Sequence, residues 1–267
     1  MTNYLVPAAN TGNDAAQIQK VIDEAYNNGC SNVVIPAGEW VIDAPVYIRK
    51  EMHVHLDGAV LKHAEGYTDY IFKNSNVLLP RAFARIGRED GITITGEKGA
   101  SIKDGKGIYF RNTGDFNISG IIFDNFGESG ITIVYSNHGR IHDLEFNGGK
   151  NALEIFIGTR NVFVYNIKGQ TVETLAAFSS ASREEMVYYN GPVVANHIVR
   201  NLEAEVSGNL VSLSGEDVKD IIISDAKVCG NASEAVKIDG ADGITITGVE
   251  YKTVVNPDNQ CKKLFVK

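Results

Sequence analysis

The sequence GITITG at residues 91–96 returns unchanged at residues 243–248, and variants of it recur between these two copies. In each copy apolar residues alternate with polar ones, which is the period of a strand that buries one face. The last apolar residues of the seven copies are Ile94, Ile118, Ile141, Val164, Val199, Ile223 and Ile246. Successive copies lie 24, 23, 23, 35, 24 and 23 residues apart. A nearly constant period of this size indicates a solenoid, in which each repeat stacks on its neighbours.

A turn residue follows each apolar run by two positions, and glycine, asparagine and aspartate tolerate the left-handed backbone that a tight corner needs. The seven turn residues are Gly96, Gly120, Asp143, Asn166, Asn201, Asp225 and Gly248. Such short turns leave no room for crossover helices, so we predict an all-β parallel β-helix with coils about 4.8 Å apart. A β-sandwich has similar turn spacing but no constant period.

Two segments depart from the repeat. Residues 13–29 are predicted to form a helix that caps the N-terminal end of the solenoid and hides its apolar side chains and strand edge. Its apolar face consists of Ile18, Val21, Ile22 and Ala25. The single gap of 35 residues predicts an inserted loop at 179–190 within one continuous domain, 1–267.

Composition limits the partners. The net charge of −8 and the pI near 5.3 argue against nucleic acid or an anionic membrane as a general partner. No stretch reaches transmembrane length, and residues 1–11 lack a signal-peptide pattern. We therefore expect a cytoplasmic protein, a virion-associated one if it is phage-derived, or one whose leader is missing from this sequence. Cys30, Cys229 and Cys261 are too widely spaced for a zinc site, so we expect core thiols and no metal or cofactor.

Five segments resemble the polygalacturonase-type branch (glycoside hydrolase family 28) of the pectin-lyase-like superfamily. They are DAAQIQ at 14–19, VVIPAGEW at 33–40, HVHLDGA at 53–59, IFKNS at 71–75 and GPV at 191–193. This resemblance implies a right-handed parallel β-helix that acts on carbohydrate. The opening pattern is shared by hydrolases, lyases, epimerases and phage tailspikes, so it implies the fold more strongly than one activity.

The resemblance also points to catalytic positions, which are altered in this chain. Family members carry one aspartate in an Asn-Thr-Asp or Gly-Asp-Gly segment and two adjacent aspartates one coil later, and such carboxylates act as acid and base in hydrolysis. The first position corresponds to Asn151, and the adjacent pair corresponds to Glu173 and Thr174. The Gly-His-Gly and Arg-Ile-Lys motifs have no counterpart, and Lys237 is the nearest basic residue in a late coil.

Strand parity suggests a second carboxylate on the same face. If Leu153 and Ile155 point inward, Glu154 points outward, and we predict that Glu154 and Glu173 form an acid/base pair on adjacent coils. Outward residues at the neighbouring corner are Glu128 and Lys150, which we assign to substrate binding. The alternative is a surface ladder of Glu128, Lys150 and Glu173 in which the lysine separates two carboxylates.

The inserted loop supplies further candidate binding residues. Tyr188 and Tyr189 can stack on the apolar face of a sugar, and Arg183 can bind a carboxylate through two hydrogen bonds. A surface insertion without function is the competing interpretation. Among the histidines, His53 and His55 share a strand but lack a third metal ligand, and His138 is expected in a turn. His142 and His197 are expected at exposed strand positions.

Two classes of function remain open. The first is a divergent glycosidase that hydrolyses an acidic or plant-type oligo- or polysaccharide, or a lyase or epimerase in which Lys150, Arg183 or Lys237 neutralises a uronate. The second is a non-catalytic glycan-binding module of the adhesin or phage-tailspike type. A homotrimer is expected if the protein is phage-related, and otherwise a monomer.

Overall fold

The computed structural model describes residues 3–7, 12, 14–79, 87–180, 193–230, 234–250, 254–255 and 264–267. The elements of the first half are β1 Tyr4–Leu5, α1 Asp14–Asn27, β2 Asn32–Ile42, β3 Val46–Ile48, β4 His53–His63, β5 Phe72–Asn74, the 3-10 helix η1 Ser75–Leu78, β6 Glu89–Asp90, β7 Thr93–Glu97, β8 Ser101–Lys103, β9 Ile108–Arg111, β10 Thr113–Gly114, β11 Asn117–Ser119, β12 Ile122–Asp124 and β13 Ser129–Val134. The second half contains β14 Asn137–Phe156, β15 Arg160–Ser179, β16 Val194–Ser214, β17 Val218–Cys229, β18 Glu234–Asp239, β19 Ile244–Val249, β20 Val254–Val255 and β21 Leu264–Val266.

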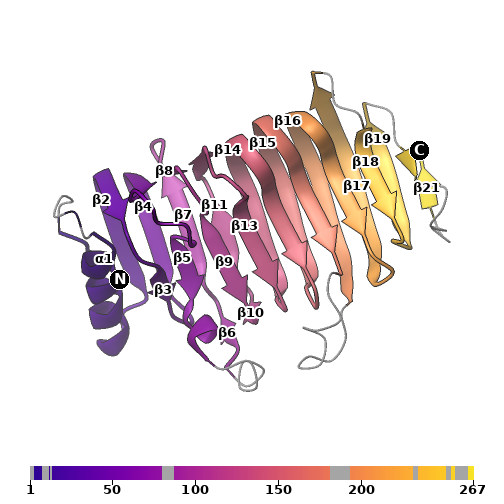
Figure 1. The fold of residues 1–267 in the computed structure, drawn as a ribbon. Helices are drawn as coiled ribbons and strands as arrows, with labels where there is room; N and C mark the ends of the chain where they lie inside the picture. The colour runs from indigo at the N-terminus through magenta and orange to yellow at the C-terminus, as the bar shows by residue number, and fades with distance from the viewer. Residues whose placement is uncertain are drawn as a thin grey trace.

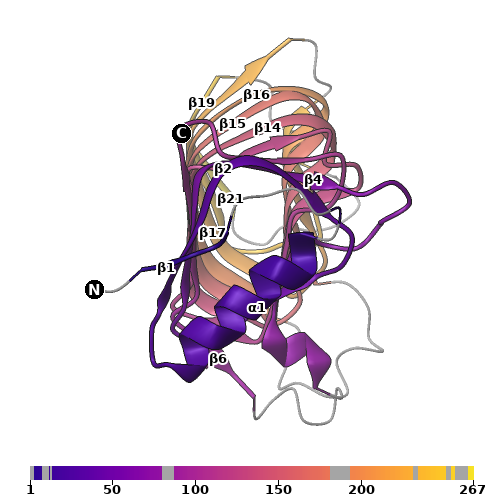
Figure 2. The same ribbon diagram turned by 90° about the vertical axis from the view of Figure 1, so that its left-hand side faces the viewer.

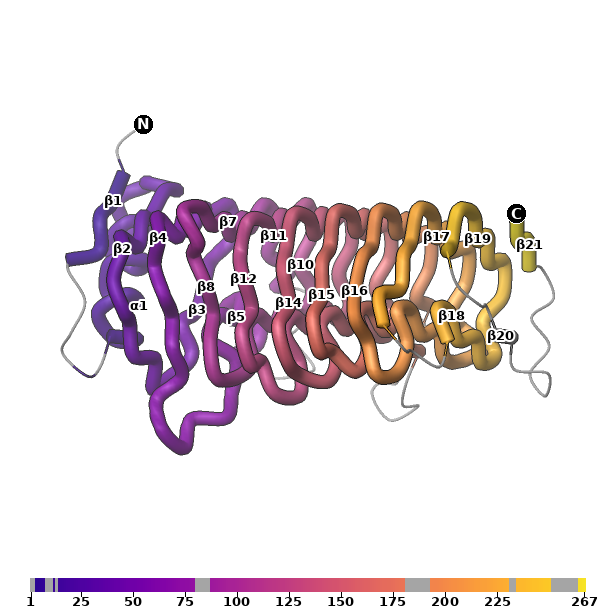
Figure 3. Tube along the Cα trace, turned by 90° about the horizontal axis from the view of Figure 1, so that it is seen from above, coloured from indigo at the N-terminus to yellow at the C-terminus, as the bar shows by residue number. Residues whose placement is uncertain are grey.

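The chain forms a right-handed parallel β-helix of about nine coils, which confirms the predicted fold. Figures 1 and 3 show the coils stacked in chain order from the N-terminal to the C-terminal end. All of the strand pairings in the described residues are parallel. Each coil contributes to three faces, which we name the first, second and third sheets in the order in which the chain passes through them.

The sheets are defined by their strands. The first sheet holds β7, β11, β19, β21 and the opening residues of β2, β4, β14, β15, β16 and β17. The second sheet holds β8, β12 and the residues that follow in the longer strands. The third sheet holds β3, β5, β9, β13, β18, β20 and the final residues of β14, β15 and β16.

The seven ladder residues lie in one continuous register on the first sheet. Ile118 pairs with both Ile94 and Ile141, and the row continues through Val164, Val199, Ile223 and Ile246. All seven are buried. Val164 pairs directly with Val199 despite the gap of 35 residues, so the additional residues lie between the ends of β15 and β16 and leave the ladder intact.

Most of the predicted turn residues do adopt left-handed backbone, and their side chains connect the coils. Asp143, Asn166 and Asn201 have φ values of 52°, 56° and 52°. The Asn166 amide donates to Asp143 Oδ1 at 2.8 Å, and the Asn201 amide donates to Asn166 Oδ1 at 2.6 Å. These bonds form a ladder along the corner between the first and second sheets.

This ladder gives a stability prediction. Asn166→Ala removes two inter-coil hydrogen bonds and places alanine at positive φ, so we expect it to lower the free energy of unfolding by about 2 kcal/mol in urea titrations. Asn161→Ala is the matched control, because Asn161 also has positive φ, at 55°, but has no side-chain hydrogen bond among the described contacts. Equal losses for the two variants would show that backbone conformation, and not the ladder, determines stability at this corner.

The predicted cap helix is α1, and its apolar face of Ile18, Val21, Ile22 and Ala25 is buried. Figure 2 shows α1 lying across the N-terminal end of the solenoid. Asp14 Oδ2 accepts a 2.8 Å hydrogen bond from the Val41 amide, which fastens the helix to β2. Gly29, at φ 69°, follows the helix, and the Cys30 amide returns to the Ala25 carbonyl at 2.9 Å.

Two expectations require correction. His197, expected at an exposed position, is 1% exposed. It lies two residues before Val199 and therefore shares the inward parity of that ladder residue. Cys30 and Cys229 carry free thiols but are only partly buried. Cys229 pairs with Glu205, which faces outward. Cys261 lies outside the described residues. Within the described part of the chain, no helix has the length and apolar character of a membrane span.

Candidate functional site

A single row of outward residues crosses the third sheet and brings together most of its chemically active side chains. The row consists of Lys73, Tyr109, Thr132, Glu154, Ala177, Ser212 and Lys237, each paired with the next. The side chains of this row point outward because they alternate along their strands with inward residues. The flanking Leu153, Ile155 and Phe178 are all fully buried. Ala177 and Ser212 have small side chains, so the surface of the third sheet is recessed between Glu154 and Lys237.

Glu154 is held on both carboxylate oxygens. The Thr132 hydroxyl donates to Oε2 at 2.7 Å from the preceding coil, and the Asn151 amide donates to Oε1 at 2.9 Å from the same strand. Glu154 is partly buried and Thr132 is 4% exposed. A carboxylate fixed in this way keeps one orientation and one face toward solvent.

Tyr70 extends this network from the loop before β5. Its hydroxyl and that of Ser129 each lie 2.8 Å from Thr132 Oγ1. Since Thr132 donates its only hydroxyl proton to Glu154, Tyr70 and Ser129 must be the donors to Thr132. Burial, together with the negative charges of Glu154 and Asp69, raises the pKa of Tyr70, so its phenol stays protonated.

Aromatic rings and lysines surround the network. The rings of Tyr70 and Tyr109 lie 5.3 Å apart, and the Lys106 ammonium lies 5.5 Å from the centroid of Tyr70. Lys73 forms a 2.5 Å ion pair with Asp69. We name the group of Tyr70, Lys106, Tyr109, Thr132 and Glu154 the Glu154 site.

The structure brings some of the predicted site residues together and separates others. Asn151 and Glu154 are in contact, as described above. Lys150 donates to both oxygens of Glu128, at 2.9 and 3.0 Å, and this ion pair raises the pKa of Lys150. Glu173 is exposed, and its charge also acts on Lys150. These contacts match the alternative interpretation, in which Glu128, Lys150 and Glu173 form a charged surface ladder.

The register separates Glu173 from Glu154 along the strand. Glu154 pairs with Ala177, four residues after Glu173, which corresponds to about 13 Å on a straight strand. The contacts described for the Glu154 carboxylate do not include Glu173. A direct acid/base pair of these two residues stays a prediction.

The remaining predicted binding residues divide into two groups. Lys237 lies exposed in the same row as Glu154, three coils farther on. Arg183, Tyr188 and Tyr189 lie outside the described residues.

Sequence reasoning missed Tyr70, Lys106, Tyr109 and Thr132. Tyr109, Thr132 and Glu154 are 23 and 22 residues apart, so extending the repeat to the third sheet would have aligned them. Tyr70 and Lys106 lie in loops between strands, where the period gives no information about position.

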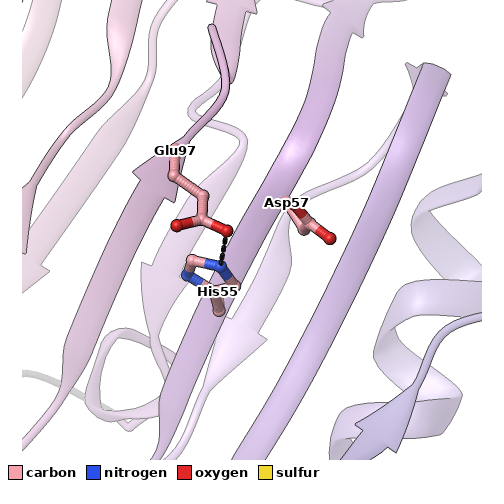
Figure 4. A group of neighbouring side chains, drawn as sticks. All are labelled: His55, Asp57 and Glu97. Carbon is pink, nitrogen blue, oxygen red and sulfur yellow. Dashed lines mark ion pairs between the residues drawn. The ribbon is translucent and has the colours of Figure 1, made fainter.

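A second polar cluster lies on the first sheet, where Figure 4 shows the side chains of His55 and Glu97 facing each other with Asp57 beside them. Ligand atoms of the three residues lie within 4.8 Å of one another. His55 Nε2 lies 3.5 Å from a Glu97 oxygen, and His55 Nδ1 bonds the Thr95 hydroxyl at 2.8 Å. The Lys98 ammonium lies 2.6 Å from Asp57 and lowers the pKa of that carboxyl. Asp57 and Glu97 thus place two carboxylates beside His55, which corrects the expectation that it lacks a third ligand, and the Lys98 ammonium pairs with Asp57.

A groove of about 310 Å³ follows the corner between the first and second sheets. Its charged side chains alternate in sign along paired coils, from Glu145 through Lys168 to Glu203. Lys227 continues the row with a 3.2 Å ion pair to Glu203. Alternating charges at outward positions are typical of a solvated surface, to which we assign this groove.

Comparison with known proteins supports the fold. No protein-family model and no curated protein sequence matches this chain. Among solved structures, an exopolygalacturonase from Thermotoga maritima aligns with a TM-score of 0.73 and 11% identity, over 99% of this chain and 78% of the other. The tailspike of E. coli bacteriophage HK620, solved with a hexasaccharide, aligns with a TM-score of 0.66 and 16% identity, over 91% of this chain.

This chain covers only 54% of that tailspike. A third structure, the surface adhesin PfbA of Streptococcus pneumoniae, aligns over 100% of this chain and 91% of its own, with a TM-score of 0.57 and 12% identity. At these identities the similarity establishes the right-handed β-helix and leaves the activity to be inferred from the site.

Proposed function

We propose that this protein binds a saccharide chain across the outer face of the third sheet and hydrolyses it with Glu154 as the reacting carboxylate. The observation that carries the proposal is the fixed, partly buried Glu154 carboxylate beside two tyrosine rings and a low stretch at Ala177 and Ser212. Tyrosine rings pack against the apolar faces of sugars, and their hydroxyls bond the polar rim. Two similar structures are a tailspike in complex with a hexasaccharide and an exopolygalacturonase, which favours a saccharide as ligand.

Each group of the site has a role in this proposal. Glu154, as a carboxylate, activates water or stabilises the positive charge that develops at the anomeric carbon. The raised pKa of Tyr70 suits it to hydrogen bonding rather than to proton transfer. Lys106 and Lys237 lie on either side of Glu154 along the sheet and would bind acidic groups of an acidic or plant-type substrate.

A second candidate function is saccharide binding without turnover. Hydrolysis with inversion requires a second carboxyl group to protonate the leaving oxygen. Asp69 is the other carboxylate that acts on Tyr70. It accepts a hydrogen bond from the Tyr70 amide at 2.8 Å and pairs with Lys73. Glu154 and Asp69 are therefore both hydrogen-bond acceptors in the contacts described. The full-length similarity to an adhesin agrees with this alternative.

A combined binding and product screen separates the two functions. The wild-type protein is incubated with acidic and neutral oligosaccharides, and new reducing ends are measured alongside equilibrium binding. Hydrolysis requires both binding and new reducing ends, whereas binding without products supports the second function. Products that absorb in the ultraviolet through a new C=C bond would instead identify elimination, and no binding to any saccharide would contradict both functions.

Tyr109→Ala tests the position of the bound saccharide. We expect the variant to bind the best ligand of the screen about fivefold more weakly, because a ring that stacks on a sugar contributes on the order of 1 kcal/mol. Tyr26→Ala is the matched control, since Tyr26 is 36% exposed on α1, at the capped end of the solenoid. If both variants bind like the wild type in calorimetry, the saccharide does not contact the Glu154 site.

A further inference from the structure

A second surface with binding chemistry lies on the first sheet, where β14, β15 and β16 run side by side. One outward row contains Arg140, Phe163, Ile198 and Ile222, and the neighbouring row contains His142, Tyr165, Arg200 and Ser224. We name the six residues Arg140, His142, Phe163, Tyr165, Ile198 and Arg200 the arginine–aromatic face. It belongs to a different sheet from the Glu154 site, so both can be occupied at once.

Planar side chains are stacked along this face from coil to coil. The rings of His142 and Tyr165 lie 4.6 Å apart and are parallel within 3°. The guanidinium carbon of Arg200 lies 4.9 Å from the Phe163 centroid and 5.6 Å from the Tyr165 centroid. A guanidinium that rests on rings keeps its edge N–H groups directed away from them, in the fork that binds carboxylates and sulfates.

Within the part of the chain that the structure describes, the two arginines of this face are not paired with carboxylates, whereas His142 lies 2.6 Å from Asp143. Arg140 and Arg200 are exposed, and neither forms an ion pair with any carboxylate among the described residues. The exposed lysines Lys98, Lys150 and Lys227 are paired. Exposed Lys168 and Lys237 resemble the two arginines, because no ion pair is described for them.

Apolar surface accompanies the arginines. Ile198 is 43% exposed and Ile222 is 44% exposed, in the same row as Phe163. The face thus presents aliphatic and aromatic surface beside two unpaired cations. A polymer of anionic sugars has the complementary chemistry, with apolar ring faces and regularly spaced negative groups.

We propose that the arginine–aromatic face is a second binding surface, specific for an anionic polysaccharide whose carboxylate or sulfate groups are bound by Arg200 and Arg140. Two coils separate the arginines, which corresponds to about 10 Å along the solenoid. That spacing matches charges on alternate sugars of a chain that runs along the axis. An extended peptide is disfavoured, because the backbone groups of these interior coils are already paired with neighbouring coils and cannot add a strand.

The test compares the double variant Arg140→Ala/Arg200→Ala with Lys20→Ala/Lys62→Ala, which changes the net charge equally at distant exposed positions. Binding to immobilised dextran sulfate and polygalacturonate is measured by surface plasmon resonance at two salt concentrations, with neutral dextran as reference. We expect the arginine variant to lose at least about tenfold in affinity and the lysine variant to change less than about twofold. Wild-type affinity should fall as salt rises.

Three outcomes would overturn the proposal: no binding of either anionic polymer by the wild type, equal losses in the two double variants, or equally strong, arginine-dependent binding of polyglutamate, which would indicate an acidic polypeptide as partner. Circular dichroism melting curves check that both variants are folded. The proposal does not depend on hydrolysis, and Arg140→Ala/Arg200→Ala should keep the product yield of the wild type in the oligosaccharide screen. A result that contradicts binding at the arginine–aromatic face can therefore be distinguished from one that contradicts the Glu154 site.

Discussion

Replacing Glu154 by glutamine is expected to lower kcat at least about a hundredfold on the substrate that the screen identifies, with KM changed little. The substitution removes the negative charge that would activate water or stabilise the transition state, and it keeps the size of the side chain. The Thr132 hydroxyl can still donate to the new amide oxygen, and the Asn151 amide can reverse to accept from the new NH₂ group. The fold should therefore be retained, and reducing-end assays at saturating substrate measure the loss.

Glu173→Gln is the matched control for this prediction. Glu173 is exposed beside Lys150 and has no described contact with the Glu154 network, so we expect nearly wild-type turnover. The opposite pattern, with activity lost in Glu173→Gln and kept in Glu154→Gln, would place the chemistry at the corner that the family resemblance suggested. Loss in both variants would restore the predicted acid/base pair of Glu154 and Glu173.

The second large effect concerns His197 and pH. Burial lowers the pKa of His197 from 6.5 to about 4, although the hydrogen bond of its Nε2 to the Thr159 carbonyl opposes this shift. Below pH 6.5 His197 is protonated in the unfolded chain but stays neutral in the folded chain. The free energy of unfolding therefore decreases as the pH is lowered. The loss extends from about pH 6.5 down to about pH 4 and amounts to about 3 kcal/mol for this one residue.

Urea unfolding between pH 7 and pH 4 measures this effect as a difference between proteins. In His197→Gln the amide can replace both hydrogen bonds of the imidazole but cannot titrate, so its stability should fall less steeply with pH than that of the wild type. His138 was expected in a turn but lies in β14, at an exposed position with a φ of 52°. His138→Gln should follow the wild-type slope. If His197→Gln and the wild type have identical pH dependence, His197 is not held neutral by burial.

The fold was predictable because the period and the alternation carry independent information. The period places residues such as Ile118 and Ile141 on adjacent coils, and the alternation decides which side chains are buried. The same logic would have placed His197 inside, two residues before Val199. Ile198, which lies between His197 and Val199, is the outward residue of this strand and is 43% exposed.

The candidate site was predictable only in part. Glu154 and Asn151 follow from strand parity and family resemblance, and the structure joins them through one hydrogen bond. Tyr70 reaches Thr132 from a loop, and loop conformation depends on contacts that no repeat specifies. Lys150 was correctly placed near Glu128, but pairing alone could not decide between substrate binding and a surface ladder.

The most direct test of the central claim is a crystal structure of the Glu154→Gln variant with the best-bound oligosaccharide of the screen. We expect the sugar to lie along the outer face of the third sheet, with one ring against Tyr109 and the scissile linkage beside position 154, above Ala177. Density for sugar elsewhere on the solenoid, with the third-sheet face bare at saturating ligand, would contradict the assignment of the Glu154 site.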